Sequence, residues 1–208
     1  MEIEYKGANC VVIKAKNGLV VVDPESAVNL RDYGENAVVL YTDPRFETDA
    51  KQSGFVVDMP GEFERGEVSI SGIAVKRHID PEADGKQGTM YRIELGSVRL
   101  VVLGHIDSPL SEEDLEKIGV VDIAIVPVGG GGYTLDAEDA AAVIKQIEPR
   151  AILPVHFEDG TRYEVPQDKL SVFESEFGGL QDDKGASLKL KNIDELPEGP
   201  VVIKLKKS

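Results

Sequence analysis

The sequence of 208 residues contains no tryptophan, one cysteine and only three histidines. Because Cys10 is alone, the chain can form no internal disulfide and no zinc site with four cysteine ligands. No stretch approaches the roughly 18 consecutive apolar residues that a transmembrane helix needs. The first residues, 1–5, lack the basic and apolar segments of a secretory signal. These absences predict a cytoplasmic protein that does not associate with membranes.

Positive charge is also scarce, because 23 Lys and Arg residues stand against 38 Asp and Glu residues, which gives a net charge of −15. Such a surface repels phosphate backbones, so we expect no direct contact with nucleic acid. Hydrophobic residues make up 41% of the chain, as in ordinary globular proteins. Length and composition together predict one compact domain that spans residues 1–208.

Short runs rich in β-branched residues predict strands along most of the chain. Asn17-Gly18 lies between two of these runs and is a strong signal for a β-hairpin, and Gly96-Ser97 predicts a second tight connection. The predicted strands are residues 10–13, 19–22, 37–41, 54–57, 68–75, 90–95, 98–103, 121–128, 151–155, 187–190 and 201–205.

Three segments in the second half predict helices, at residues 111–118, 136–147 and 166–177. Ser111 and Asp114 have the spacing of a capping box at the start of the first helix. Pro149 ends the second helix, and the third has Pro166 near its start, where the missing N–H costs nothing. Alternation of strands and helices predicts sheets that are covered by helices.

Several motifs occur in order along nearly the whole chain. They are Gly7-Ala8-Asn9-Cys10, Val22-Asp23-Pro24, Pro60-Gly61-Glu62-Phe63-Glu64, Leu103-Gly104-His105, Pro127-Val128-Gly129-Gly130, Tyr133-Thr134-Leu135-Asp136 and Pro154-Val155-His156-Phe157. This series resembles the metallo-β-lactamase superfamily, in particular its UlaG-like branch of small metal-dependent hydrolases. The resemblance implies the α+β class and a four-layer αββα sandwich, in which two mixed β-sheets are flanked by helices.

The same resemblance implies a hydrolase that cleaves esters, amides or phosphodiesters with one or two bound zinc, iron or manganese ions. A bound metal lowers the pKa of water from ~15.7 to ~7 and so supplies hydroxide at neutral pH. The main ligand motif of the superfamily is His-x-His-x-Asp-His, which directly follows a buried strand. In this chain the corresponding strand is residues 37–41.

The positions of that ligand motif hold Thr42, Pro44, Phe46 and Glu47. Proline and phenylalanine offer no ligand atom, and threonine is a poor ligand for zinc. Glu47 is the one potential survivor, and Asp43 or Asp49 could substitute only after a shift of register. We therefore expect that this half of the metal centre has been lost.

All three histidines fall on metal-ligand positions of the family that the chain resembles. His78 aligns with the next family histidine, His105 with the bridging aspartate and His156 with the last ligand. One interpretation is that His78 and His156 are relics and that His105 is there by chance. The other is a rebuilt site that holds a single metal through all three imidazoles, which is a sound ligand set for hydrolytic zinc. Such a site would need a catalytic carboxylate, for which Glu47, Asp80 and Asp107 are candidates.

The run Gly129 to Gly132 lacks the Gly-Lys-Ser/Thr that completes a phosphate-binding loop. A tight turn that passes close to the position of the family's active-site cleft explains these glycines better. Gly130 and Tyr133 could still line a pocket there, together with Thr42 and Asp43, and we take these four as candidate ligand-binding residues.

Three functions remain open from the sequence. The leading hypothesis is a vestigial, non-catalytic member of the fold, without a cofactor, that binds a small molecule or a partner protein. The second is a metal-dependent hydrolase of esters, lactones or phosphodiesters that uses one zinc, iron or manganese ion. The third is a protein scaffold within a nucleic-acid-processing complex. Exposed sheet edges near the termini favour a homodimer.

Overall fold

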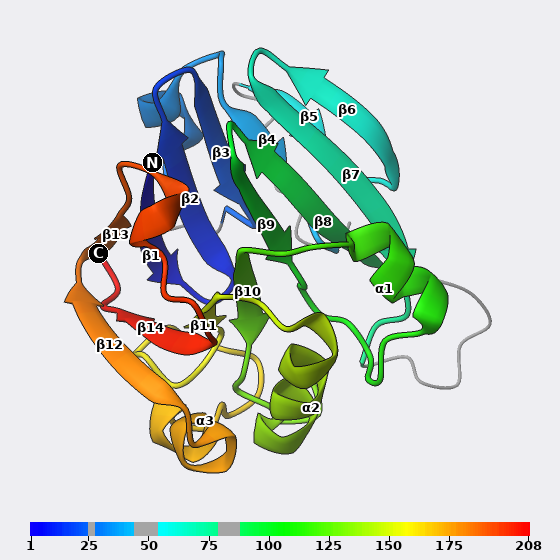
Figure 1. The fold of residues 1–208 in the computed structure, drawn as a ribbon, viewed down its shortest axis with the longest axis vertical. Coiled ribbons are helices and arrows are strands. Elements are labelled where there is room, and N and C mark those ends of the chain that lie inside the picture. Colours follow the sequence, from blue (N-terminus) through cyan, green and yellow to red (C-terminus); the bar gives the residue numbers. More distant parts are fainter. Residues whose placement is uncertain (25–27, 44–53, 79–87) are drawn as a thin grey trace.

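The computed structural model describes residues 1–24, 28–43, 54–78 and 88–208, which form two mixed β-sheets with helices beside them (Figure 1). The first sheet has the order β13-β1-β2-β3-β4-β5, with β13 Ser187–Lys189, β1 Glu2–Gly7, β2 Cys10–Ala15, β3 Gly18–Val22, β4 Val38–Leu40 and β5 Phe55–Val57. The second has the order β12-β14-β11-β10-β9-β8-β7-β6, with β12 Leu180–Gly185, β14 Val201–Leu205, β11 Ala151–Val155, β10 Ile123–Pro127, β9 Val98–Val102, β8 Gly88–Leu95, β7 Val68–Val75 and β6 Gly61–Arg65. The expected sandwich of mixed sheets and flanking helices is confirmed.

Both predicted hairpins form. The Asn17-Gly18 turn joins β2 to β3 and the Gly96-Ser97 turn joins β8 to β9, each as an antiparallel pair. The strands β3, β4 and β5 run parallel to one another, and so do β9, β10, β11, β14 and β12. Parallel neighbours place the ends of successive strands at the same edge of a sheet, which gathers the loops after them.

The helices are α1 Glu112–Ile118, α2 Ala137–Ile147 and α3 Leu170–Phe177, with short 3-10 segments η1 Leu30–Tyr33 and η3 Ile193–Glu195. The capping box predicted for α1 is present, since Ser111 and Asp114 each bind the backbone N–H of the other. The Asp136 side chain caps α2 by accepting from the N–H of Asp139 at 2.9 Å. Within the described part of the chain, no helix has the length and apolar character needed to cross a membrane.

The predicted start of the third helix was wrong by four residues, because α3 begins at Leu170 rather than at Pro166. The N–H of Asp168 donates to the carbonyl of Gly129, and its carbonyl accepts from Glu158, both at 2.8 Å. These tertiary hydrogen bonds hold the preceding residues in an extended path that a helix could not follow. Strands β1, β6 and β12 were not predicted either.

The core lies between the two sheets, and a smaller cluster covers the outer face of the first sheet. Along β2, Val11 and Ile13 point into the main core, whereas Cys10 and Val12 join Leu30 in the outer cluster. This alternation follows the two-residue period of a strand. The buried Cys10 thus acts as a small apolar side chain, as its surroundings in the sequence predict.

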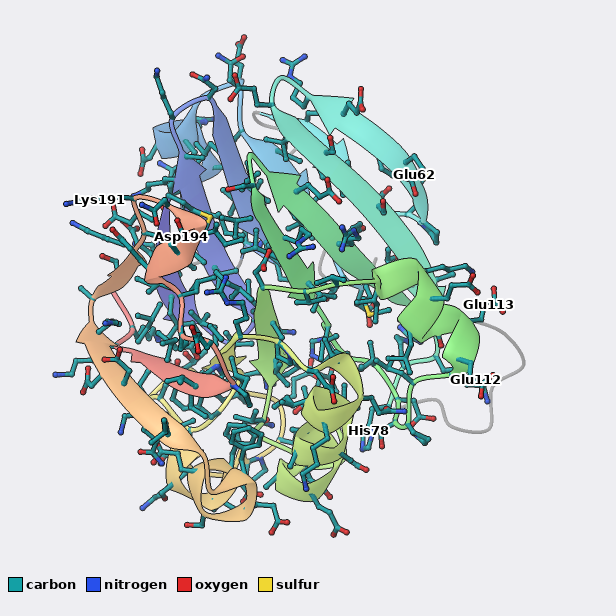
Figure 2. The ribbon with its side chains drawn as sticks, in the orientation of Figure 1. Glu62, His78, Glu112, Glu113, Lys191 and Asp194 are labelled. Carbon is teal, nitrogen blue, oxygen red and sulfur yellow. The ribbon has the colours of Figure 1, made fainter. Side chains whose placement is uncertain are left out.

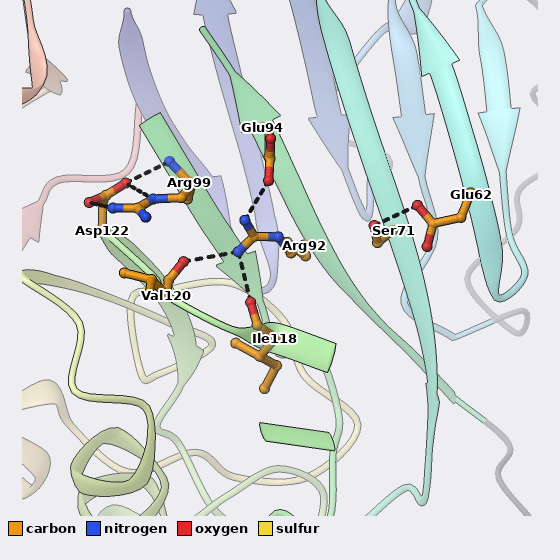
Figure 3. Close-up of polar contacts among 8 residues, drawn as sticks. All are labelled: Glu62, Ser71, Arg92, Glu94, Arg99, Ile118, Val120 and Asp122. Atoms are coloured by element: carbon orange, nitrogen blue, oxygen red, sulfur yellow. Dashed lines mark hydrogen bonds and ion pairs between the residues drawn. The ribbon is translucent and has the colours of Figure 1, made fainter. Parts of the chain in front are cut away.

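Arginine side chains fasten the second sheet to the loops before β10 (Figure 3). Arg99 on β9 binds the buried carboxylate of Asp122 through its backbone N–H, Nε and Nη2, at 2.8 to 2.9 Å. Arg92 on β8 donates to the carbonyls of Ile118 and Val120, at 2.7 and 2.9 Å, and pairs with Glu94. These contacts fix the chain that leads from α1 into β10.

Candidate functional site

The loops that follow β9, β10 and β11 meet at one edge of the second sheet. They carry His105, the Gly129–Tyr133 segment and His156. The first sheet contributes Asn9 from the β1–β2 turn and Asp23 from the end of β3. A backbone hydrogen bond of 2.7 Å from the N–H of His156 to the carbonyl of Ala8 joins the two groups of loops.

His105 and His156 are in direct contact, with ring centroids 5.2 Å apart and planes at 85°. Both side chains are about 95% buried, since His105 is 4% exposed and His156 5%. Tyr133 lies edge-on to His105 at 5.5 Å, and Tyr163 lies against His156 at 4.7 Å. Two imidazoles and two phenol rings therefore share one small region of the interior.

The orientation of His156 is fixed by Gln167. The Nδ1 atom of His156 lies 3.0 Å from Oε1 of Gln167, whose amide nitrogen is itself bound to the carbonyl of Val165 at 3.1 Å. Because the amide oxygen can only accept, Nδ1 must carry the hydrogen, which leaves the lone pair of the neutral ring on Nε2. Burial lowers the pKa of His156 below its usual value, so the neutral ring predominates at pH 7.

Asn9 holds His105 from the other sheet, with its amide nitrogen 3.1 Å from Nδ1 of the ring. Asn9 is 4% exposed, and its amide oxygen is buried without a hydrogen-bond partner among the described residues. A buried polar atom without a partner costs free energy, and native proteins rarely leave one unexplained. A group that donates a hydrogen bond to this oxygen would offset that cost.

Backbone strain is concentrated around this region. Ala8, Asp23 and His156 have φ values of 48°, 41° and 52°, in the left-handed region that non-glycine residues seldom adopt. Among the described residues, the one other non-glycine residue with positive φ is Glu148, which caps the end of α2. Strained backbone that persists in a fold often accompanies a binding or catalytic site.

The glycine run forms the tight turn that the sequence predicted. A Cβ atom on Gly129 would lie 2.1 Å from the carbonyl oxygen of His156, and one on Gly131 would lie 2.6 Å from that of Pro166. These positions must lack a side chain because two other loops pass directly against the backbone. The run thus brings β10 and its loop against the segment that holds His156 and Gln167.

Thr42 and Asp43, two of the candidate ligand-binding residues, are bound to other protein groups. The backbone N–H and the hydroxyl of Thr42 donate to the two carboxylate oxygens of Asp23, at 2.7 and 2.6 Å. Asp43 is fully buried and receives two hydrogen bonds from Nη1 of Arg77, at 3.1 and 3.0 Å. The polar contacts described for Thr42 and Asp43 are therefore contacts with other groups of the protein.

His78 lies beside His105 along the backbone, because its N–H donates to the carbonyl of His105 at 2.9 Å. Its side chain faces Asp107 instead, with Nδ1 3.7 Å from the carboxylate, and Figure 2 shows it on the lower right of the molecule. Ser108, in the same loop, donates to Asp139 of α2 at 2.5 Å. Of the three histidines, the structure brings two into ring contact.

A cavity of about 150 Å³ opens between the two sheets' loops. It is lined by Asn9, Asp23, His105, Tyr133, His156, Arg162, Tyr163, Glu164, Val165 and Gln167. Of the four candidate ligand-binding residues, Tyr133 lines this cavity, whereas Thr42, Asp43 and Gly130 stand outside its lining. The motifs around Asn9 and Asp23 were signals in the sequence, but nothing in the pattern of residues 162–167 indicated a wall of the cavity.

A hydrolytic metal needs three or more imidazole, thiolate or carboxylate ligands. Among the described residues, no group of three or more His, Cys, Asp or Glu side chains is placed to hold a metal ion. The described residues therefore do not fit the superfamily's metal centre. Pro44, Phe46, Glu47, Asp49 and Asp80 lie outside the described residues, and the predicted metal-ligand roles of His78, His105 and His156 stay predictions.

A family model for the beta-lactamase superfamily domain matches residues 2–156, from β1 to the histidine after β11. The chain belongs to this family. The match ends at His156. The matched region therefore includes Asn9, His105 and His156, but not residues 162–167 of the cavity lining.

Individual relatives agree with this family. A UPF0173 protein of Pyrococcus furiosus is 26% identical over 179 residues, which cover 76% of this chain and 83% of the relative. A protein of Thermoplasma acidophilum named a UPF0173 metal-dependent hydrolase is 30% identical over 99 residues, 44% of this chain and 43% of the relative. The crystal structure of a metallo-beta-lactamase superfamily protein from Thermotoga maritima has a TM-score of 0.76 at 23% identity, covering 99% of both chains.

Proposed function

We propose that this beta-lactamase superfamily protein has lost the metal-dependent hydrolytic centre and binds a small polar ligand in the cavity beside His105 and His156. The observation that carries the proposal is the pairing of Thr42 with Asp23. Thr42 stands where the resembling family has its first histidine ligand, and both of its hydrogen-bond donors are directed to Asp23. A metal ion there would have to compete with a buried and fully formed pair of hydrogen bonds.

The cavity has the features of a binding site rather than of a packing defect. It is lined by polar and aromatic side chains, contains a buried oxygen of Asn9 that has no partner in the described part of the chain, and lies next to strained backbone at Asp23 and His156. Its size, about 150 Å³, suits a small molecule. The net charge of −15 supports a small molecule or a protein as the partner rather than nucleic acid.

A second candidate function, a metal-dependent hydrolase, is favoured by one specific observation. Nε2 of His156 has its lone pair available in a buried cavity next to a second imidazole, and the relative from Thermoplasma acidophilum is named a metal-dependent hydrolase. In that function, a third ligand would have to join His105 and His156. The two proposals differ in whether the chain shows metal-dependent turnover at all.

The test is an assay of chromogenic esters, lactones and phosphodiesters with the purified chain, after removal of metals and after addition of zinc, manganese or iron(II). We expect no turnover above that of buffer with the same metal, and no rise in melting temperature with excess metal. Metal-dependent turnover that disappears in His156→Asn, a variant that tolerates the left-handed backbone at this position, would establish the hydrolase instead. Lys191→Ala, which changes an exposed residue outside the cavity, is the matched control.

A further inference from the structure

Four residues that line the cavity, Asn9, Asp23, His156 and Glu164, carry hydrogen-bond acceptors. The oxygen of Asn9 is unpaired among the described residues, and Nε2 of His156 carries a lone pair because Gln167 occupies Nδ1. The carboxylates of Asp23 and Glu164 also line the cavity. The two tyrosine hydroxyls of the lining are committed as donors, since Tyr163 donates to the carbonyl of Phe157 at 2.9 Å and Tyr133 to Glu164 at 3.2 Å, whereas Arg162 is an exposed cationic donor.

The balance of charge around the cavity is negative. Asp23 and Glu164 are acidic, and among the described lining residues Arg162 is the one Lys or Arg. Arg162 is exposed, whereas Asp23 is 2% exposed, so solvent screens the positive charge more than the negative one. The protein as a whole carries −15 charges, and its field therefore attracts cations and repels anions.

Aromatic faces complete the environment. The rings of Tyr133 and Tyr163 flank the imidazole of His156, with centroid distances of 6.5 and 4.7 Å. The faces of aromatic rings carry negative electrostatic potential and attract organic cations. The volume of about 150 Å³ is comparable to a cavity that holds one benzene molecule. A ligand of this size is a small molecule and not a peptide or a nucleotide.

Resting on the proposed function, we infer that the ligand of this cavity is a small organic cation, a protonated or quaternary amine. Its N–H or O–H groups would donate to the unpaired oxygen of Asn9 and to Nε2 of His156. Its positive charge would lie near the carboxylate of Asp23 and against the rings of Tyr133 and Tyr163. This class of ligand supplies donors to Asn9 and His156 and matches the sign of the charge on the buried Asp23.

The experiment measures binding of choline, ethanolamine and putrescine to the metal-free chain by thermal shift and calorimetric titration, with acetate and inorganic phosphate as anionic probes at the same ionic strength. We expect at least one amine to raise the melting temperature and neither anion to do so. Arg162→Glu should tighten amine binding about fivefold at low salt, because it removes a repelling charge and adds an attracting one. Tyr133→Leu should weaken it about fivefold, because it removes a cation-binding ring.

Lys191→Glu is the matched control, because it makes the same change of charge at an exposed residue outside the cavity, on the opposite side of the view from His78 (Figure 2). It should leave amine binding unchanged. Circular dichroism of each variant establishes that it is folded. Asn9→Leu, which keeps the volume but removes the amide, gives a second test through loss of amine binding.

The inference is overturned if acetate or phosphate binds more tightly than the amines and loses affinity in Arg162→Glu. It is also overturned if no amine shifts the melting temperature at about 100 mM, a concentration about a hundred times a dissociation constant of 1 mM. The proposed function fails by a different result, namely metal-dependent turnover in the assay described above. Anion binding by a metal-free, inactive chain would therefore reject the ligand class and leave the proposed function in place.

Discussion

Thr42 donates two hydrogen bonds to Asp23, one from its backbone at 2.7 Å and one from its hydroxyl at 2.6 Å. Both residues are 98% buried, since each is 2% exposed. Replacing Thr42 by valine keeps the shape of the side chain but removes the hydroxyl and leaves one oxygen of Asp23 without this partner. We expect the free energy of unfolding to fall by about 1–3 kcal/mol, measured by urea denaturation. Thr42→Ser should keep most of the stability, and a valine variant as stable as the wild type would contradict the role of this pair.

Histidine cannot be restored at position 42 without cost. A Cβ atom on Gly104 would lie 2.5 Å from Cβ of Thr42, so the chain after β9 passes directly against this side chain. The larger imidazole of Thr42→His should therefore overpack the site and lose the hydroxyl bond to Asp23. We expect a loss of about 2–4 kcal/mol in the free energy of unfolding, measured with and without zinc. Stabilisation of this variant by zinc would contradict the account of the site.

Position 129 needs glycine because another loop passes directly against its backbone, whereas position 132 needs glycine only because its φ is positive. In Gly129→Ala the new Cβ would meet the carbonyl oxygen of His156 at 2.1 Å, so one of two rigid loops must move. Gly132→Ala meets nothing within 4 Å and keeps a φ of +71°, which costs about 1 kcal/mol. We expect Gly129→Ala to lose at least about twice as much stability in urea denaturation. Equal losses would show that the turn does not pack against His156.

The pKa of His156 makes the fold sensitive to mild acid. Burial holds this pKa below the usual value near 6.5, so the unfolded chain takes up a proton more readily than the folded one. The free energy of unfolding should therefore fall as the pH drops below about 6.5 and continue to fall until the folded pKa is reached. His156→Asn should remove this part of the slope, measured by denaturation between about pH 8 and pH 5. An unchanged slope in the variant would assign the effect to another group.

Asp122 should give a slope at lower pH. Burial opposes its ionisation, but the hydrogen bonds from the side chain and backbone of Arg99 outweigh burial and lower the pKa of the carboxyl below 3.8. The stability that this carboxylate contributes is present above the unfolded pKa and is lost as the pH falls through the folded value. Asp122→Asn should cost about 1–3 kcal/mol at pH 7. The difference from wild type should shrink below about pH 4, and a difference independent of pH would contradict an ionic contribution.

The sequence predicted the parts of the fold that depend on local patterns. The Asn17-Gly18 hairpin, the capping box of α1 and the buried runs of β10 and β11 follow from residue type and period, and all are present. The ordered motifs also indicated the sandwich. Strand β12, Leu180 to Gly185, was missed because its charged and glycine residues have low strand propensity and its pairing with β14 is a tertiary effect.

The site was predictable where its residues fall on motifs of the family that the chain resembles. His105 and His156 were identified because they fall on ligand positions of the family that the chain resembles, and the structure places their rings in contact. The role of Gln167 in orienting His156, and the cavity wall formed by Arg162 and Tyr163, depend on where a loop folds back in space. The position of α3 was predicted wrongly for the same reason, because tertiary hydrogen bonds of Asp168 decide the path of that loop.

The metal content of the chain, measured by inductively coupled plasma mass spectrometry after purification without chelators, most directly tests the proposal that the hydrolytic centre has been lost. We predict well below about 0.1 equivalents of zinc, iron and manganese together, with the same result for a variant in which His105 and His156 are both replaced by alanine. About one tightly held ion per chain that is absent from the double variant would contradict the account.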